Sequence, residues 1–343
     1  MSVLMECFCS PFHELKLLFK EAYQLSRTRF QNKLHFYTPG VTHYDMPFHQ
    51  ATSPYRFPGI SITGRKCWLH CEHCKGRLLE SMIPAPTPEK LLKVATMVKT
   101  TGGIGCLISG GSLMGGGVPL KKFVSTMKRI RQEMGLKIVV HTGLINQPTA
   151  EELADVGIDA AMIDVIGSDE TISSVYHLDR SVEDFSSVLT VLEENSIPIV
   201  PHIVVGIHYG RLLGERRAVE MLSRHDPAAL VIVAFTPLAD TPMEHASVPT
   251  PVDIARVVLA SRLSMPHIPI ALGCARPRGA HKARIDALAI RAGVNGLAYP
   301  SIQAYNLAKR LKLDIEFHEE CCSLLWKEPS LVERGHMPIP LSR

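Results

Sequence analysis

The chain has 343 residues, of which 46% are hydrophobic and 20% are charged. That composition is ordinary for a soluble globular enzyme, and no apolar run approaches the roughly 20 residues of a membrane span. The net charge of +4 is small and scattered, so we expect neither a nucleic acid nor a membrane surface as the main partner. The length fits a single large α/β barrel.

The cysteines and the N-terminal residues indicate the compartment. The chain contains nine cysteines, an odd number, and three of them have the spacing of a metal site. Metal binding in a reducing compartment explains this usage better than a disulfide framework. Residues 1–7 lack the basic start, apolar centre and cleavage site of a secretory signal. We therefore expect a cytoplasmic protein.

The first predicted element is an amphipathic helix over residues 12–31, where apolar side chains recur every three or four residues. A loop rich in proline, histidine and tyrosine follows, to about residue 56. From residue 57 onward, short apolar runs alternate with helical patterns in eight units. The runs are rich in β-branched and small apolar residues, which is typical of parallel strands buried on both faces. The predicted strands are 57–63, 104–109, 137–141, 159–165, 198–204, 229–235, 268–273 and 294–298.

Helical stretches lie between these strands, and some have recognisable starts. Thr87 is predicted to cap one helix ahead of Pro88, and Thr149 is predicted to cap another. Eight β/α units predict a (β/α)8 barrel of the TIM type, with the active site at the carboxyl ends of the strands. We assign residues 57–312 to this barrel. Residues 1–56 form an N-terminal cysteine segment and helix, and residues 313–343 form an extension over the barrel mouth.

Three cysteines follow the first predicted strand. Cys67, Cys71 and Cys74 have the spacing C-x3-C-x2-C. Three thiolates this close can hold three irons of a [4Fe–4S] cluster and leave the fourth iron open to a small molecule. A zinc site is the alternative, with His70 or His73 as the fourth ligand.

This motif resembles the signature of the radical S-adenosylmethionine (SAM) superfamily. In that superfamily the amino and carboxylate groups of SAM bind the open iron, and an electron cleaves SAM to a 5′-deoxyadenosyl radical. The resemblance implies a [4Fe–4S] cluster and SAM as cofactors. Strand two ends in Gly110-Gly111-Ser112, which is similar to the family's GGE motif at the SAM amino group, with Ser112 in place of the acidic residue. A plain flexible turn is the alternative.

Later segments resemble the biotin-synthase branch of the superfamily. Strand five ends near Gly206, and the loop after strand six contains Thr236-Pro237 and Thr241-Pro242. With residues 176–181 and 292–296, the order and spacing of these segments extend the likeness over roughly residues 12–311. The resemblance implies that Gly206 lies near SAM.

Polar residues at other strand ends are candidates for the cavity. Asp164 ends strand four and is a candidate for binding the SAM ribose or the substrate. His141 ends strand three and His208 follows strand five, although a histidine there is more often structural than catalytic. After strand seven, the resemblance to biotin synthase implies that Cys274 or Arg276 faces the cavity. The alternative is a buried thiol and a solvent-facing guanidinium.

Two further cysteine pairs lie near the ends of the chain. Cys7 and Cys9 precede the first helix, and Cys321 and Cys322 lie in the C-terminal extension. Both pairs can fold over the same end of a barrel, and four thiolates suit a second, auxiliary iron–sulfur cluster. A structural zinc ion, a redox pair and coincidence are the alternatives. Cys106, within strand two, is expected to pack in the core.

These features predict a radical SAM enzyme that inserts sulfur into unactivated C–H bonds. The pattern most resembles the archaeal-type two-component lipoyl synthases, which are sulfurtransferases. That resemblance implies an octanoylated lipoyl carrier protein (an H-protein or an E2 domain) as substrate, a second lipoyl synthase subunit and a ferredoxin-type electron donor. One alternative is a mutase or lyase on a small substrate, of the methylornithine synthase or hydrogenase-maturation type. The other is a non-catalytic cluster-binding scaffold subunit.

Overall fold

The computed structural model describes residues 2–40, 44–50 and 52–332. Within these residues, eleven parallel strands form one curled sheet in the order β13-β1-β12-β11-β10-β9-β8-β7-β6-β4-β5. Two short strands, β2 (Asp45–Met46) and β3 (His49–Gln50), pair separately as an antiparallel hairpin. The strands of the main sheet are β1 (Lys33–Tyr37), β4 (Gly59–Ser61), β5 (Ile83–Pro84), β6 (Gly105–Ser109), β7 (Lys137–His141), β8 (Ala160–Asp164), β9 (Ile199–Val205), β10 (Leu230–Ala234), β11 (Ile270–Leu272), β12 (Gly296–Ala298) and β13 (Asp314–His318).

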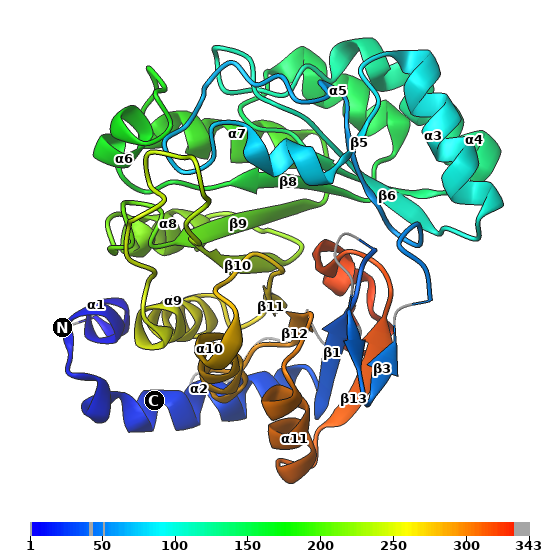
Figure 1. The fold of residues 1–343 in the computed structure, drawn as a ribbon. Helices are drawn as coiled ribbons and strands as arrows, with labels where there is room; N and C mark the ends of the chain where they lie inside the picture. Colours follow the sequence, from blue (N-terminus) through cyan, green and yellow to red (C-terminus); the bar gives the residue numbers. More distant parts are fainter. Residues whose placement is uncertain (1, 41–43, 51, 333–343) are drawn as a thin grey trace.

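Helices cover the outer side of the sheet (Figure 1). The α-helices are α1 (Val3–Cys9), α2 (Lys16–Arg29), α3 (Pro88–Thr100), α4 (Val124–Met134), α5 (Gln147–Val156), α6 (Asp169–Ser174), α7 (Val182–Glu194), α8 (Glu215–Leu222), α9 (Pro251–Ser264), α10 (Gly279–Arg291), α11 (Ile302–Arg310) and α12 (Pro329–Val332). The described residues also contain four short 3-10 helices, η1 (Phe12–Leu15), η2 (Arg77–Ser81), η3 (Lys121–Phe123) and η4 (Cys322–Lys327). In the part of the chain that the structure describes, no helix combines the length and apolarity needed to span a membrane.

The eight predicted strands are confirmed as β4 and β6 to β12, and they neighbour one another in chain order. Among the described residues the sheet does not close into a ring, because its two ends are β13 and β5. The α/β fold is therefore a partial TIM-type barrel, a half-barrel whose carboxyl strand ends all point the same way because the strands are parallel.

β1 and β13 extend the sheet beyond the predicted barrel strands. β1 lies in the segment that was predicted to be a loop, and β13 lies in the predicted C-terminal extension. Each residue of β1 pairs with a residue of β13 about 280 positions later, and β1 also pairs with β12. A hydrophobic pattern is local, so it cannot show such a distant pairing. Residues 333–343 of the predicted extension lie outside the described residues.

Helix starts confirm one predicted cap and correct another. Thr87 caps α3, since its Oγ1 accepts the backbone N–H of Lys90 at 3.3 Å. α5 begins earlier than predicted, because Asn146 caps it instead of Thr149. The Asn146 side chain accepts the N–H of Thr149 at 3.2 Å. A proline near the start of each helix fits the fixed φ of its first turn.

Alternate residues of the strands face two different apolar layers. Residues such as Ile138 pack beneath the helices, whereas Val139 and Met162 face the concave side of the sheet. On that side they belong to one apolar cluster with Leu324 and Leu325 of η4, which are fully buried. The red C-terminal segment in Figure 1 thus fills part of the half-barrel.

Candidate active site

The cysteine trio lies on the loop that joins β4 to η2, beyond the carboxyl end of β4. Cys71 and Cys74 are buried, whereas Cys67 is half-buried. Cys67 borders a pocket of about 790 Å³, which Gly111 and Ser112 also line. The predicted cluster motif and the predicted SAM-binding turn therefore lie side by side, as the order of the strands requires.

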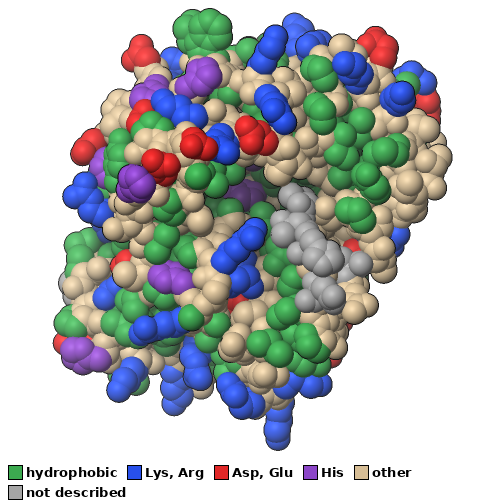
Figure 2. Space-filling model, viewed as in Figure 1, with side chains coloured by type: hydrophobic (Ala, Val, Ile, Leu, Met, Phe, Trp, Pro, Cys, Tyr) green, Lys and Arg blue, Asp and Glu red, His purple; other side chains and the backbone are tan. Residues whose placement is uncertain are grey.

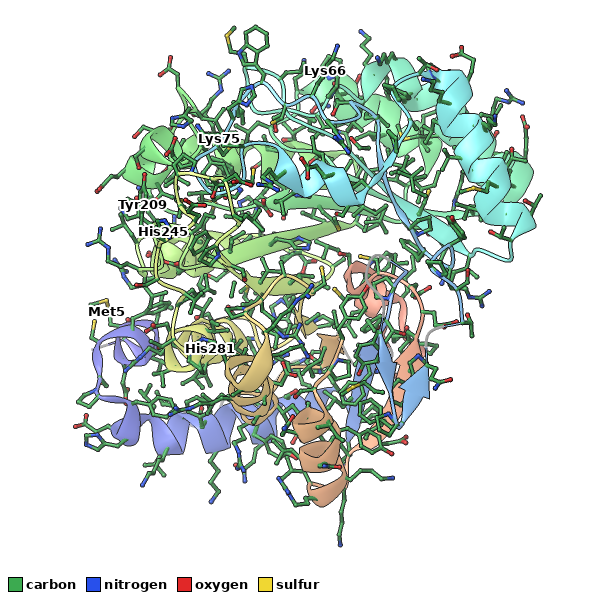
Figure 3. The ribbon with its side chains drawn as sticks, in the orientation of Figure 1. Met5, Lys66, Lys75, Tyr209, His245 and His281 are labelled. Carbon is green, nitrogen blue, oxygen red and sulfur yellow. The ribbon has the colours of Figure 1, made fainter. Side chains whose placement is uncertain are left out.

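The carboxyl ends of several strands meet on the same side as this loop. Figure 3 shows Lys66 and Lys75, which flank the trio in the sequence, on the upper loops. Tyr209 and His245 lie below them, on the loops that follow β9 and β10. Figure 2 shows that the face in view is hollowed near its centre, with Lys or Arg side chains beside the hollow.

Hydrogen bonds of backbone N–H groups fix the cysteine loop to two neighbouring loops. The N–H of Trp68 donates to the carbonyl of Ser112 at 2.9 Å, and the N–H of Gly111 donates to Thr63 Oγ1 at 2.7 Å. The N–H of Glu72 donates to the carbonyl of Val175, just after α6, at 2.8 Å. The segments after β4, β6 and α6 therefore hold the trio together.

Two residues after α6, Tyr176 and His177, contact the cysteine loop, and the sequence did not predict these contacts. His177 Nε2 lies 2.8 Å from Glu72 Oε1, and the Cys71 thiol donates to the carbonyl of Tyr176 at 3.8 Å. The Tyr176 ring also lies beside that of His73, with 5.1 Å between the ring centroids. Residues 176–181 belong to the segments that resemble biotin synthase, but the sequence did not show that they contact the cysteine loop.

Cys71 and Cys74 influence each other's pKa. A hydrogen bond between the Cys71 and Cys74 thiols lowers the pKa of Cys74, assisted by His73 and by the backbone at Gly76. The same hydrogen bond, together with burial, raises the pKa of Cys71. Metal ions bind cysteine in its deprotonated thiolate form. Three thiolates on one loop fit an iron–sulfur cluster, which favours soft sulfur ligands.

Gly111 lies where no side chain would fit. A Cβ atom at this position would lie 2.1 Å from the carbonyl oxygen of Lys66 and 2.5 Å from the Cα of Cys67. Both neighbours are backbone atoms, so they cannot move aside as a flexible side chain can. Glycine therefore lets the loop after β6 touch the cysteine loop.

We expect Gly111→Ala to separate these two loops and to weaken both iron binding and SAM cleavage. Overpacking of this kind costs about 1–3 kcal/mol. If this cost raises the activation barrier of SAM cleavage, the rate drops about fivefold to 150-fold. The rate of 5′-deoxyadenosine formation and the iron content measure the effect. Gly115→Ala is the matched control, because a Cβ there would meet only the Arg180 guanidinium, at 3.6 Å. Equal rates for the two variants would contradict the assignment.

Three polar side chains lie on the concave face of neighbouring strands β7, β8 and β9. Asp164 and His202 are register partners, and His141 Nε2 lies 3.6 Å from Asp164 Oδ1. Burial opposes the ionisation of Asp164, but His141, His202 and His73 outweigh it and hold its pKa below the usual range. Burial lowers the pKa of His202 to about 4. The site thus offers a carboxylate and a neutral imidazole close to the cysteine loop.

Three thiols gather on the concave side near the end of β11. Cys274 is exposed. Cys321 and Cys322 lie at the start of η4, and the charge of Cys321 raises the pKa of Cys274, while that of Cys274 raises the pKa of Cys322. A hydrogen bond between the two adjacent thiols lowers the pKa of Cys321 and raises the pKa of Cys322. The Cys321 thiol also donates to Ser323 Oγ at 3.4 Å. Cys274 therefore lies near enough to Cys321 and Cys322 to interact with them electrostatically.

Of the two residues predicted after β11, Cys274 is exposed and Arg276 is buried. It is fully buried and pairs with the buried Asp286, with Nε 2.9 Å from Oδ1. Its other N–H groups donate to the carbonyls of Gly273 and Tyr299. A buried guanidinium needs such partners, so this residue fixes the turn that carries Cys274.

The N-terminal cysteines lie away from the C-terminal pair, contrary to the prediction of one four-thiolate site. Cys7 is buried in α1, which packs against α9, and its carbonyl accepts a hydrogen bond from Arg256 at 2.6 Å. Figure 1 shows α1 on the outer side of the helices, whereas the segment with Cys321 and Cys322 lies within the half-barrel. Cys9 is exposed. This arrangement does not bring the four thiols together.

Two residues predicted for the site, Gly206 and His208, lie just after β9. The N–H of Gly206 donates to Glu215 Oε1 at 2.8 Å, and its carbonyl accepts the N–H of Gly210, so both of its backbone groups are engaged within the protein. A role of Gly206 near SAM stays a prediction. His208 is buried beneath α6, where Nδ1 lies 3.1 Å from Thr171 Oγ1. Its Nε2 lies 3.6 Å from Glu170 Oε1 of α6. A role of His208 in the cavity stays a prediction.

The chain is similar to curated biotin synthases, although no family model matches it. One from Prochlorococcus marinus (strain SARG) is 26% identical over 186 residues, which make up 53% of this chain and 54% of the relative. Another, from the NATL2A strain of that organism, is 24% identical over 248 residues, or 70% of each chain. The chain thus spans about half the length of the first of these relatives.

Solved structures show the same fold at lower sequence identity. Methylornithine synthase matches with a TM-score of 0.61 and 15% identity, over 98% of this chain and 93% of that one. The [FeFe]-hydrogenase maturase HydG from Carboxydothermus hydrogenoformans matches with a TM-score of 0.65 and 14% identity, over 98% and 84%. These likenesses confirm the half-barrel.

Proposed function

We propose that this chain, a radical SAM protein distantly related to biotin synthases, cleaves SAM and removes a hydrogen atom from a small substrate in its half-barrel. A reduced cluster on the trio would supply the electron for SAM cleavage and so the 5′-deoxyadenosyl radical. The contact of Gly111 with the backbone at Cys67 carries this proposal, because it joins the thiol loop to the turn that resembles the SAM-binding motif.

Cys67, Cys71 and Cys74 would hold the cluster. Gly110, Gly111 and Ser112 would lie beside bound SAM. Trp68 and Glu72 keep the loop in place through their backbone hydrogen bonds. The apolar concave side of the sheet, with η4, would help to exclude water and so protect a reactive radical from side reactions.

The side chains of Asp164, His141 and His202 on the concave face support a small, amino-acid-derived substrate. An ionised carboxylate on the concave face can pair with an ammonium group, and a neutral imidazole at His202 can accept a hydrogen bond. His202 Nδ1 donates to the carbonyl of Val200 at 3.1 Å, so Nε2 carries the lone pair. Such a reaction would be a rearrangement or a bond cleavage, and it needs no second cluster.

A second candidate is sulfur insertion, and the gathering of Cys274, Cys321 and Cys322 favours it. These thiols would hold an auxiliary cluster as sulfur donor. The substrate would then be an octanoylated carrier protein, with a second lipoyl synthase subunit and a ferredoxin-type electron donor as partners. Iron and sulfide analysis separates the two candidates.

For the small-substrate reaction we expect about four irons per chain after reconstitution, the content of one [4Fe–4S] cluster. Replacing Cys321 and Cys322 by serine should then leave both the iron content and 5′-deoxyadenosine formation unchanged. Iron well above four that falls in this double variant would instead establish the auxiliary cluster. Reduced protein that binds iron but forms no 5′-deoxyadenosine would leave only a scaffold role.

A further inference from the structure

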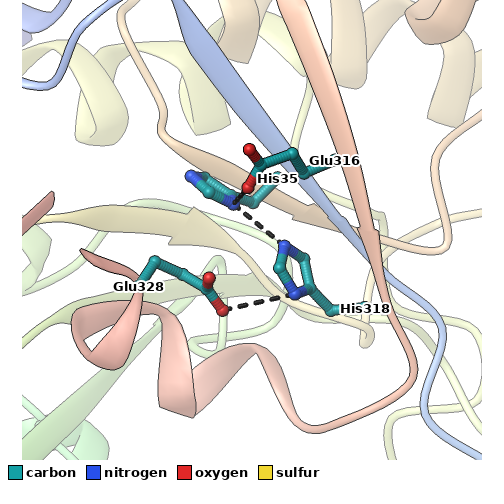
Figure 4. A group of neighbouring side chains, drawn as sticks. All are labelled: His35, Glu316, His318 and Glu328. Carbon is teal, nitrogen blue, oxygen red and sulfur yellow. Dashed lines mark hydrogen bonds and ion pairs between the residues drawn. The ribbon is translucent and has the colours of Figure 1, made fainter. Parts of the chain in front are cut away.

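Four metal-binding side chains converge at the edge of the sheet, apart from the cysteine site. His35 lies on β1, Glu316 and His318 lie on β13, and Glu328 follows η4 (Figure 4). One donor atom from each lies within 4.8 Å of the other three. The group joins residues almost 300 positions apart, so no spacing in the sequence could predict it.

The distances between these atoms suit one metal ion. His35 Nδ1 lies 3.0 Å from His318 Nε2 and 3.5 Å from Glu316 Oε2. Metal–ligand bonds of about 2.0–2.2 Å at tetrahedral angles place neighbouring donor atoms about 3.3–3.5 Å apart. The two distances from His35 Nδ1 differ from this spacing by a few tenths of an ångström at most, and all the donor atoms of the group lie within 4.8 Å of one another, so one ion could lie among them.

The surroundings hold these donor atoms in orientation. Glu328 Oε1 lies 3.3 Å from His318 Nδ1, the nitrogen that points away from His35 (Figure 4). A carboxylate that accepts the Nδ1 hydrogen leaves the lone pair on Nε2, which is how metal-binding histidines are held. The Tyr37 ring also stacks on His318, with centroids 4.9 Å apart. Lys33 binds Glu316 Oε1, which leaves Oε2 turned toward His35.

We propose that His35, Glu316 and His318 bind one divalent transition-metal ion, and that Glu328 orients His318. Two imidazoles and a carboxylate without a thiolate are typical ligands of zinc and of other late first-row cations. The ion would fasten β13 and the segment after η4 to β1. Cys321 and Cys322 lie between His318 and Glu328, so the ion would also fix the segment that brings these thiols into the half-barrel.

Zinc binding to the full-length, iron-reconstituted protein tests this site. After one equivalent of zinc chloride, we expect about one tightly bound zinc per chain. Its X-ray absorption should show only nitrogen and oxygen ligands at about 2.0–2.2 Å, without the sulfur at about 2.3 Å that cysteine ligands give. Sulfur in the zinc shell, or no bound zinc, would overturn the proposal.

Variants locate the ion. His318→Gln should lose the bound zinc, and Glu328→Gln should bind it about 10–100-fold more weakly, as is typical when the partner of a metal-binding histidine is removed. His245→Gln is the matched control, because that side chain is 92% exposed on another loop. Circular dichroism and iron content check each fold. If His318→Gln fails to fold, the less buried Glu316→Gln should show the same loss. Full zinc binding by the folded variant would contradict the site.

Discussion

Replacing Cys71 by alanine is expected to abolish SAM cleavage and to remove most of the bound iron. A [4Fe–4S] cluster that uses three protein thiolates has no spare ligand at its open iron, because SAM occupies that position in the enzymes that this motif resembles. Cys71 is also central to the loop, since its thiol interacts with that of Cys74 and contacts the Tyr176 carbonyl. Iron analysis and chromatographic measurement of 5′-deoxyadenosine give the two results.

Cys106→Ala is the control for this experiment. Cys106 is a buried cysteine of β6 that takes no part in the loop, and its thiol packs in the core as predicted. This variant should keep its iron and its SAM cleavage. Cys71→Ala protein with undiminished 5′-deoxyadenosine formation would contradict the assignment of the trio.

Replacing Asp286 by asparagine is expected to lower the free energy of unfolding by about 3–5 kcal/mol, because it leaves a buried charge without its partner. Asp286 is fully buried, pairs with Arg276 and Lys282, and accepts the N–H of Ser301 at 2.8 Å. Burial opposes its ionisation, yet the charges of Arg276 and Lys282 hold its pKa below the usual range. This stabilisation is therefore present above the carboxyl's unfolded pKa and is lost as the pH falls through the folded pKa.

Denaturation by urea under anaerobic conditions measures this change. Glu133→Gln is the matched control, because Glu133 forms a surface pair with Arg129 at 3.0 Å and such pairs contribute only about 0–1 kcal/mol. If Asp286→Asn lowered the free energy of unfolding by less than about 1 kcal/mol, the prediction would be wrong, and the Arg276 guanidinium would have sufficient partners without Asp286.

The repeating part of the fold could be predicted from the sequence. Each barrel strand has its own local apolar run, so eight of the nine strands from β4 to β12 were predicted, and only the short β5 was missed. The pairing of β1 with β13 could not be predicted, because Lys33 and His35 interrupt the apolar pattern and the partner lies at the other end of the chain. In the described residues the sheet that includes β1 and β13 does not close into a ring, and this open form could not be predicted from the sequence either.

The candidate site was predictable where chemistry is confined to a short motif. The C-x3-C-x2-C spacing and the Gly110-Gly111 turn belong to neighbouring strands, so the fold had to bring them together. The terminal cysteines were a different case, since nothing local fixes where a terminal segment packs. Cys7 packs against α9 on the outer side of the molecule, whereas Cys321 and Cys322 lie near Cys274. The spacing of the cysteines in the sequence could not reveal that Cys274 is their neighbour.

Reductive cleavage of SAM by the unmodified protein tests the central claim most directly. The reconstituted chain is mixed anaerobically with SAM and dithionite, and 5′-deoxyadenosine and methionine are measured over time. We expect both products in equal amounts, formed only when the reductant is present. A chain that carries about four irons and yields neither product would contradict the claim that this half-barrel is a radical SAM enzyme.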